Sequence, residues 1–248
     1  MTVTESRHQQ LAVRIVHPTN LLGFERHQMW GLFSRYYENV DREMFDIDLA
    51  DKDLAFLLEV GNDVVGFTTA SFCEVLNQGK TTKVIFSGDT IVDQPYWGEF
   101  HIAKAWLGEM GRLYQLDPMT DHYWFLIVKG HRTFRYLPIF AHDYVPNGKC
   151  SRNSESLLEL RNFLALDRFG EYFNASTGII RFSQPRGNLQ ADWAEPSARE
   201  LKFPEVQFFL QANPDFREGD ELACLCSLSP KNMKPLARRW FDAGRNAA

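Results

Sequence analysis

The pattern of apolar and polar positions is clearest between residues 82 and 114, where it predicts a strand, a short loop and a helix. Thr82–Val92 is rich in β-branched and apolar residues, which favours a strand buried on at least one face. Asp93-Gln94-Pro95 ends that strand, because proline lacks the N–H group that a sheet ladder needs. An amphipathic helix is predicted over Glu99–Tyr114, since its apolar residues recur at the helical period: Phe100, Ala103, Trp106, Leu107, Met110, Leu113 and Tyr114.

The start of this helix is a candidate anion site. The first N–H groups of a helix have no partner within the helix, and the helix dipole favours negative charge at that end. A strand that enters a helix through a tight loop therefore offers a place for a phosphate. The hypothesis about function begins from this strand–loop–helix unit.

The chain before this unit predicts a strand, two helices and an antiparallel hairpin. Leu11–Val16 reads as the first strand, and a helix from Asn20 to Asn39 follows the break at His17-Pro18. The acidic segment Asp41–Lys52 is predicted to be mostly helical. Asp53–Val60 and Val64–Phe72 form the predicted hairpin around Gly61-Asn62-Asp63.

The chain after the unit predicts a central strand. His122–Lys129 is a nearly continuous apolar run, as expected for a strand covered on both faces. Together with Thr82–Val92 and the helix between them, it makes a βαβ unit with parallel strands. A further helix is predicted over His131–His142, interrupted or ended near Pro138.

The turn-rich segment Val145–Lys149 is the best candidate for a boundary. The expected organisation is a flexible tail over residues 1–10, a mixed α/β core over 11–146, and an extension over 147–248 that completes or covers the core. The elements predicted for the extension are a helix at Ser154–Phe173, strands at Gly178–Phe182, Glu205–Gln211 and Glu221–Leu228, and a basic helix at Pro230–Phe241.

Composition narrows the class of protein. Of 248 residues, 44% are hydrophobic and 14% aromatic, enough for a sizeable core. The formal net charge of −5 argues against non-specific nucleic-acid binding, which basic patches drive. The first ten residues are polar, and no apolar run approaches the roughly 20 residues that span a bilayer. We therefore expect a cytoplasmic protein without a membrane span.

The order of these elements resembles the GNAT superfamily of N-acetyltransferase-like acyl-CoA transferases. The resemblance covers about residues 11–145, and it implies a central twisted mixed sheet flanked by helices. In that family a central strand ends in a splayed loop whose backbone amides hold the cofactor pyrophosphate at the start of the next helix. The corresponding residues here are Ile91-Val92 and Asp93–Gly98, which contain the expected cofactor-binding residues Val92, Gln94, Tyr96, Trp97 and Gly98.

The resemblance implies acyl transfer from a thioester to a small-molecule amine. The donor is then an acyl-CoA, or the phosphopantetheine of an acyl carrier protein, as in some relatives. The family's loop pattern is Arg or Gln, two residues, Gly, one residue, and Gly or Ala. Here Gln94 and Gly98 fit it, whereas Phe100 stands at the small-residue position. This departure leaves open an alternative, a non-catalytic GNAT-like module that binds a ligand or a partner protein.

Acyl transfer to an amine needs a polarised carbonyl, a base for the amine and an acid for the leaving thiolate. By its place in the resemblance, Tyr136 is the expected acid, and the alternative is a packed amphipathic tyrosine. Asp89 interrupts an apolar strand next to Gly88. Because a buried carboxylate is unfavourable unless it is paired, Asp89 either caps a loop or acts as base or amine-binding residue. Glu59 and Glu74 are weaker candidates for that role.

Other residues with suitable chemistry lie near the expected cleft. His101 and His131 are candidate bases, with structural or surface histidines as the alternative. Arg132, with Lys129, Arg135 and Lys149 near it in sequence, can meet cofactor phosphates or an acidic carrier protein, unless these residues form an ordinary solvated face. No cluster of His, Cys and carboxylate residues has metal-ligand spacing, so we expect no metal.

Overall fold

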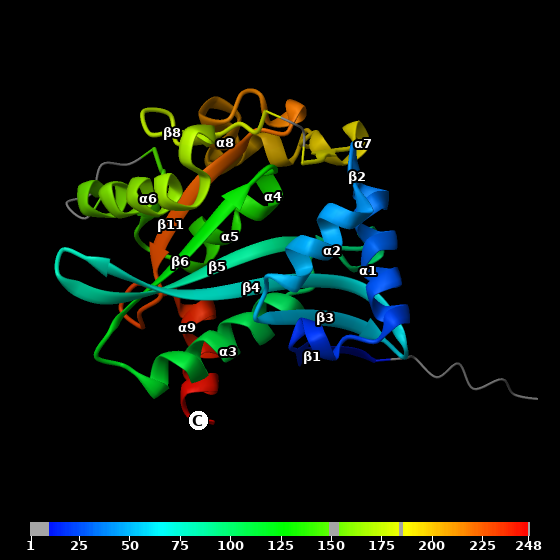
Figure 1. Ribbon diagram of the computed structural model, residues 1–248, viewed down its shortest axis with the longest axis horizontal. Coiled ribbons are helices and arrows are strands. Elements are labelled where there is room, and N and C mark those ends of the chain that lie inside the picture. Colours follow the sequence, from blue (N-terminus) through cyan, green and yellow to red (C-terminus); the bar gives the residue numbers. More distant parts are fainter. Residues whose placement is uncertain (1–9, 149–153, 184–185, 248) are drawn as a thin grey trace, which may run out of the picture.

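In the computed structural model, which describes residues 10–148, 154–183 and 186–247, most strands belong to one mixed sheet. Its order is β1-β3-β4-β5-β6-β11-β9-β8, with β7 also paired to β11 (Figure 1). All neighbours are antiparallel except β5 and β6, which run parallel. The strands are β1 (Leu11–Val16), β3 (Leu54–Val60), β4 (Asp63–Asn77), β5 (Lys80–Val92), β6 (Asp121–Val128), β7 (Tyr144–Val145), β8 (Phe173–Asn174), β9 (Ile179–Ile180) and β11 (Glu221–Ser227).

Helices cover both faces of this sheet, and a two-stranded pair lies beside it. The pair joins β2 (Tyr37–Glu38) to β10 (Asn188–Leu189). The helices are α1 (Gly23–Tyr36), α2 (Arg42–Ala50), α3 (His101–Leu116), α4 (His131–Phe134), α5 (Tyr136–Phe140), α6 (Ser154–Phe169), α7 (Ala191–Ala194), α8 (Pro204–Ala212) and α9 (Pro235–Arg245). None of the helices in the described part of the chain is both long and apolar enough to cross a membrane.

The side chains of β5 show how the two faces are divided. Successive residues of a strand point to opposite faces. Ile85 packs with the apolar face of α3 and with α9, whereas Val84 and Phe86 pack with α6. Helices α1 and α2 cover β3 and β4 on the same face as α6 and form a separate core cluster with Phe67. Figure 1 shows α3 and α9 together below the sheet, and α6 and α2 well apart above it.

The mixed α/β sheet and the βαβ unit predicted from the sequence are confirmed. The parallel pairing joins Thr82–Ser87 to Asp121–Leu126, and α3 lies between these strands in the chain. Strand β11 from the C-terminal part of the chain pairs with β6 along its length. The residues predicted to form an N-terminal tail lie outside the described residues, except Gln10.

Several predicted elements of the C-terminal part are wrong. The segment predicted as a strand over Glu205–Gln211 is helix α8, because Pro204 starts a helix at its first position and Val206 and Phe209 are buried one turn apart. In the predicted core, the helix expected over His131–His142 with an interruption or end near Pro138 is helical but divides earlier, at Arg135, into α4 and α5. The strand predicted over Gly178–Phe182 is reduced to β9, and the terminal helix begins at Pro235 rather than Pro230.

Candidate active site

The site forms where strands β5 and β6 part. They pair only as far as Ser87 and Leu126. Beyond that point Gly88–Val92 stays with β4, while Ile127–Val128 pairs with β11. Beyond this point the facing edges of β5 and β6 are no longer hydrogen-bonded to each other. Their backbone N–H and C=O groups border a gap within the described sheet.

A β-bulge marks the same point. Between the paired positions on either side, Gly88 and Asp89 of β5 both lie opposite Thr69 of β4. A bulge re-aims the side chain of the extra residue, and Asp89 lines the largest cavity of the site. A side chain at position 88 would force its neighbours to shift, because a Cβ atom there would lie 2.3 Å from Thr69 Oγ1 and 2.8 Å from Lys52 Cε.

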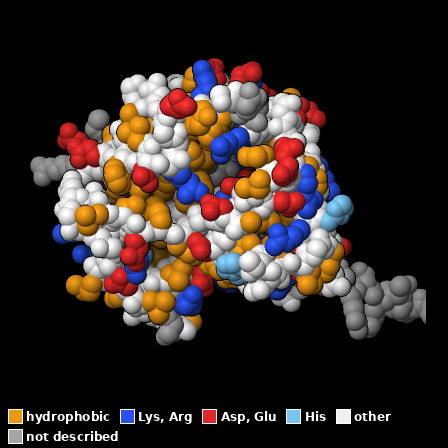
Figure 2. Space-filling view, viewed as in Figure 1, with side chains coloured by type: hydrophobic (Ala, Val, Ile, Leu, Met, Phe, Trp, Pro, Cys, Tyr) orange, Lys and Arg blue, Asp and Glu red, His pale blue; other side chains and the backbone are white. Residues whose placement is uncertain are grey.

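Two cavities meet at the gap. Cavity A, of about 440 Å³, lies between α2, α6 and the ends of β5 and β6; its residues include Asp48, Lys52, Asp89, Lys129, Arg186 and Glu221. Cavity B, of about 310 Å³, lies beyond the end of β5; its residues include Tyr36, Val92, Trp97, Arg132, Tyr136 and Trp193. Figure 2 shows a hollow on this face of the molecule, bordered by side chains of both charges.

Three residues line both cavities, namely Tyr37, Thr90 and Thr133. Thr90 and Thr133 also line a small third cavity of about 30 Å³ beneath them. The hydroxyl of Thr90 lies 2.7 Å from that of Thr68 on β4, which fixes its side chain at the gap. Because the cavities share these residues, they adjoin each other where β5 and β6 separate.

Cavity A is lined by a set of charged side chains, of which Lys52 and Glu221 are buried and Asp48 is exposed. The Lys52 ammonium donates to the Asp48 carboxylate at 2.6 Å and to the Asp48 carbonyl at 3.1 Å. Lys129 Nζ lies 3.4 Å from Glu221 Oε1, and both side chains are nearly buried. Each lysine thus has a carboxylate partner from another position in the chain. Pairing offsets the unfavourable desolvation of Lys52 in the first pair and of both charges in the Lys129–Glu221 pair.

Asp89 differs from these residues because it has no ion-pair partner within the described chain. Removal from water and, to a lesser extent, the nearby Asp48 carboxylate raise its pKa to about 7, against the lowering effect of Lys129 and Lys52. The same surroundings raise the pKa of Tyr37, chiefly through burial and then through Asp89. A carboxylate that titrates near neutral pH is suited to accept a proton from an amine.

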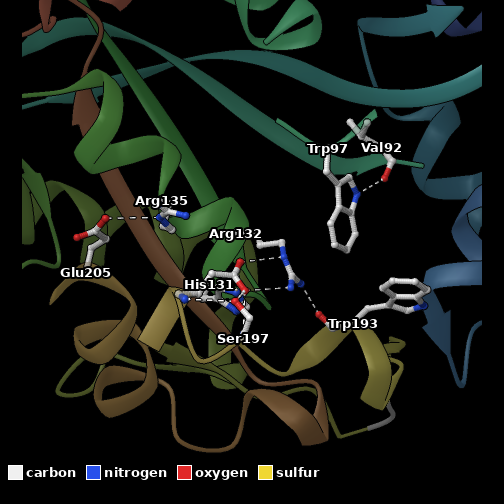
Figure 3. A network of polar contacts seen from close by, with 9 residues as sticks. Val92, Trp97, His131, Arg132, Arg135, Trp193, Ser197 and Glu205 are labelled. Carbon is white, nitrogen blue, oxygen red and sulfur yellow. Dashed lines mark hydrogen bonds and ion pairs between the residues drawn. The ribbon is translucent and has the colours of Figure 1, made fainter. Parts of the chain in front are cut away.

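A cluster of aromatic side chains lines cavity B. The Trp97 indole donates to the Val92 carbonyl at 2.7 Å, its ring meets Trp193 edge to face at 5.5 Å, and Tyr36 lies 6.3 Å away. The Arg132 guanidinium lies over the Trp97 ring at 4.5 Å. The loop after β5 is therefore held by its own side chains, as Figure 3 shows for Trp97 and Val92.

Glu200 forms an ion pair with Arg132, a cationic side chain of cavity B. Its carboxylate lies 3.3 Å from Arg132 Nε and 3.2 Å from His131 Nε2, and it accepts from the Ser197 backbone and hydroxyl at 2.8 and 2.7 Å (Figure 3). These donors lower the pKa of Glu200 to about 2, against the opposing effect of burial. Burial lowers the pKa of His131, so it is neutral at pH 7. Arg132 is thus largely neutralised by Glu200.

The structure brings most of the predicted site residues to the two cavities. Asp89 lines cavity A, and cavity B is lined by Val92, Tyr96, Trp97, Gly98, Arg132 and Tyr136. The Tyr136 ring stacks on Phe140 at 5.4 Å, and burial raises its pKa. Within the described residues the Tyr136 hydroxyl has no hydrogen-bond partner. Its predicted role as an acid stays a prediction.

Other predicted residues lie elsewhere. Gln94 does not line either cavity, and its backbone N–H donates to the Tyr36 hydroxyl at 2.6 Å. His101 begins α3 with Nδ1 3.5 Å from Glu99, also away from the cavities. Glu59 pairs with Arg14, and Glu74 is exposed. Lys149 lies outside the described residues.

Sequence reasoning did not single out Lys52, Arg186, Glu200 or Glu221. One of them carried a usable signal, because Glu221 begins an apolar strand in the way that Asp89 interrupts one. The other three stand in polar segments that resemble ordinary surface. Among the described residues, no three His, Cys, Asp or Glu side chains are grouped so that they could hold a metal ion.

No protein-family model matches the sequence, and no curated protein matches it. Solved structures similar to this chain include N-acetyltransferases of the GNAT family. One is a probable N-acyltransferase from Enterococcus faecalis V583, with 14% identity and a TM-score of 0.42; the match covers 54% of this chain and only 33% of that one. A GNAT family N-acetyltransferase from Escherichia coli in complex with CoA has 13% identity and a TM-score of 0.39, covering 53% and 69%. An aminoglycoside N-acetyltransferase in complex with CoA has 14% identity and a TM-score of 0.38, covering 53% and 85%.

Proposed function

We propose that this protein transfers an acyl group from a thioester in cavity B to an amine in cavity A, through the gap between β5 and β6. The observation that carries the proposal is the junction at Thr90 and Thr133, where the two cavities meet beside the bulge. On one side of it stands Asp89, and on the other stands Tyr136. The two sides thus offer the base and the acid that the reaction needs.

The reaction follows from these positions. The amine nitrogen attacks the thioester carbon, and the carbonyl oxygen gains negative charge. N–H groups on the open edge of β5, between Gly88 and Val92, would donate to that oxygen. Asp89 takes the proton from the nitrogen. The carbon–sulfur bond then breaks, and the Tyr136 hydroxyl donates to the leaving sulfur.

A coenzyme A thioester fits cavity B in part. The first turn of α3 opens beside Gly98 and Glu99, and its N-cap residue Phe100 makes no side-chain hydrogen bond, so the first N–H groups of this 16-residue helix are free for a phosphate. The cations are less available, because Arg132 pairs with Glu200 and Arg135 lies 3.5 Å from Glu205. Bound coenzyme A would supply the activated acyl group as a thioester.

Thiol release tests the proposal directly. Purified protein is supplied with acetyl-CoA, long-chain acyl-CoA or acyl-loaded carrier protein, together with a panel of amines, and free thiol is measured. We expect Asp89→Asn and Tyr136→Phe to lower turnover by about 10²–10⁴-fold, the usual contribution of a positioned acid or base. Donor affinity, measured by thermal shift, should stay the same, because both substitutions keep the shape of the site.

A matched control is Glu74→Gln, which changes an exposed carboxylate on the β4–β5 hairpin and should leave turnover unchanged.

A stabilisation of about 2.7 kcal/mol is expected when the donor is present at about 100 times its Kd. Full activity of both site variants would show that Asp89 and Tyr136 do not act in the reaction. Release with carrier protein alone would identify the pantetheine, without the nucleotide, as the bound part of the donor.

The non-catalytic alternative has one observation in its favour. The loop after β5 uses its donors internally, since the Gln94 N–H binds Tyr36 and the Trp97 indole binds the Val92 carbonyl. A loop satisfied in this way does not need a nucleotide. Ligand binding without thiol release from any donor would favour a binding module over an acyltransferase.

A further inference from the structure

The charges of cavity A are not all compensated from within the protein. Lys52 is held by Asp48 and Lys129 by Glu221, so these four groups cancel in pairs. What remains is Asp89 at the gap, Asp41, whose carboxylate caps α2 by accepting from the Met44 N–H, and charge of the opposite sign elsewhere on the wall. Charged groups on a cavity wall that have no close ion-pair partner are available to a ligand of complementary charge.

The remaining positive charge comes from two arginines. Arg186 lines cavity A, and in the described chain its guanidinium has no carboxylate within ion-pair distance; it lies over the Phe182 ring at 4.0 Å. Arg168 lies over the Phe86 ring at 4.1 Å, and its ion pair with the exposed Asp51 is long, at 3.7 Å. A guanidinium stacked on an aromatic face keeps its N–H edge available for an anion.

Lys129 interacts with both Arg186 and Asp89. Its ammonium donates to the backbone carbonyl of Arg186 at 2.9 Å, and its charge also lowers the pKa of Asp89. Cavity A is therefore lined by a carboxylate at the gap, Asp89, and by the guanidinium groups of Arg168 and Arg186.

We propose that the acceptor is a small zwitterionic amine, whose ammonium group binds at Asp89 and whose carboxylate or phosphate group binds at Arg186 and Arg168. This inference rests on the proposed function and names the class of its acceptor. In the reaction the nitrogen loses one proton on binding in its reactive form and a second after attack, and Asp89 relays each in turn to solvent. The thiolate leaves with the electron pair of the carbon–sulfur bond.

Binding measured without any donor separates this inference from the proposed function. Isothermal titration calorimetry compares L-phenylalanine, glycine, L-glutamate and O-phosphoethanolamine with counterparts that lack the anionic group, such as phenethylamine and ethanolamine. At least one zwitterion should bind at least 10-fold more tightly than its counterpart. The amino acids and the phosphorylated amine distinguish a carboxylate from a phosphate. Equal binding of the counterparts, or no binding of any zwitterion, would overturn the inference.

Variants locate the anion site. Arg186→Gln should lower affinity for the zwitterion at least 10-fold and leave affinity for the simple amine unchanged, whereas Arg186→Lys should recover part of the loss. Arg217→Gln is the matched control, because Arg217 is equally exposed but pairs with Glu195 away from the cavity. An unchanged zwitterion affinity in both Arg186→Gln and Arg168→Gln would refute the assignment. Thermal unfolding of each variant confirms that it is folded.

The two proposals fail in different ways. Tight zwitterion binding without thiol release from any donor would leave the ligand class standing and remove the acyl transfer. Acyl transfer to simple amines at the same rate as to zwitterions would leave the transfer standing and remove the ligand class.

Discussion

Replacing Asp89 by asparagine should stabilise the protein at alkaline pH while it lowers the turnover of the proposed reaction. The substitution keeps the size of the side chain and removes its charge. The pKa of Asp89 rises from an ordinary 3.8 to about 7 in the folded protein. Each pKa unit corresponds to about 1.4 kcal/mol, so the ionised carboxylate lowers the free energy of unfolding by an amount on the order of 4 kcal/mol.

The sign of the pH dependence follows from proton binding. Between about pH 4 and pH 7 the folded state holds a proton on Asp89 that the unfolded state has released. The stability contribution of Asp89 is therefore full below about pH 4, falls as the pH rises through this window, and is constant above it. Asp89→Asn has no such dependence. The free energy of unfolding of Asp89→Asn should exceed that of the natural protein by the largest amount near pH 8. The two values should be equal near pH 4.

Urea unfolding followed by tryptophan fluorescence at pH 8, 6 and 4.5 measures the difference. The other titrating groups are shared by both proteins, so the difference between the two curves isolates position 89. Glu74→Gln is the control and should lie within about 0.5 kcal/mol of the natural protein at each pH. A variant that is less stable than the natural protein at pH 8 would refute the reasoning, since it would mean that the Asp89 carboxylate is stabilised by partners.

Two further comparisons test the packing that holds the site. Gly111→Ala should lower the free energy of unfolding by about 3 kcal/mol, because its Cβ would lie 2.0 Å from the Phe241 carbonyl oxygen. Gly108→Ala, one turn away on α3, meets its nearest atom at 3.8 Å and should gain up to about 1 kcal/mol from helix propensity. Phe209→Ala should remove about 3–5 kcal/mol, whereas exposed Phe163→Ala should change little. Urea unfolding checks all four, and equal effects within either pair would contradict the close contact of α3 with α9 or the buried position of α8.

The parts of the fold that the sequence predicted are those with a strong local pattern. Thr82–Val92 and His122–Lys129 are long apolar runs, and the segment between them repeats at the helical period. These features are set by neighbours in the chain, so the βαβ unit follows from them without tertiary information. The segment Glu205–Gln211 has a weaker pattern, since Val206, Phe208 and Leu210 alternate while Val206 and Phe209 are one helical turn apart. Packing of Phe209 into the core decides for the helix.

The candidate site was only partly predictable, because its charges come from distant segments. Lys52, Asp89, Lys129 and Glu221 belong to four different parts of the chain. Asp89 was found because a carboxylate in an apolar strand is unusual. Its neighbours depend on the order of strands, above all on β11, which places Glu221 beside Lys129. No local pattern in the sequence predicts this order of strands in the sheet.

The charged residues of cavity A make the fold less stable than apolar residues at the same positions would. The sheet face between α2 and α6 carries aromatic side chains such as Phe86, and Asp89, Lys129 and Glu221 bring charges to the same cavity. A buried pair such as Lys129 and Glu221 contributes little relative to an apolar pair of equal volume, and Asp89 lowers stability outright. Groups that break the rule of an apolar core without a structural gain are expected at functional sites. The bulge that turns Asp89 into the cavity stands at the same residues where β5 and β6 separate, so the destabilising charge and the opening of the sheet form one feature.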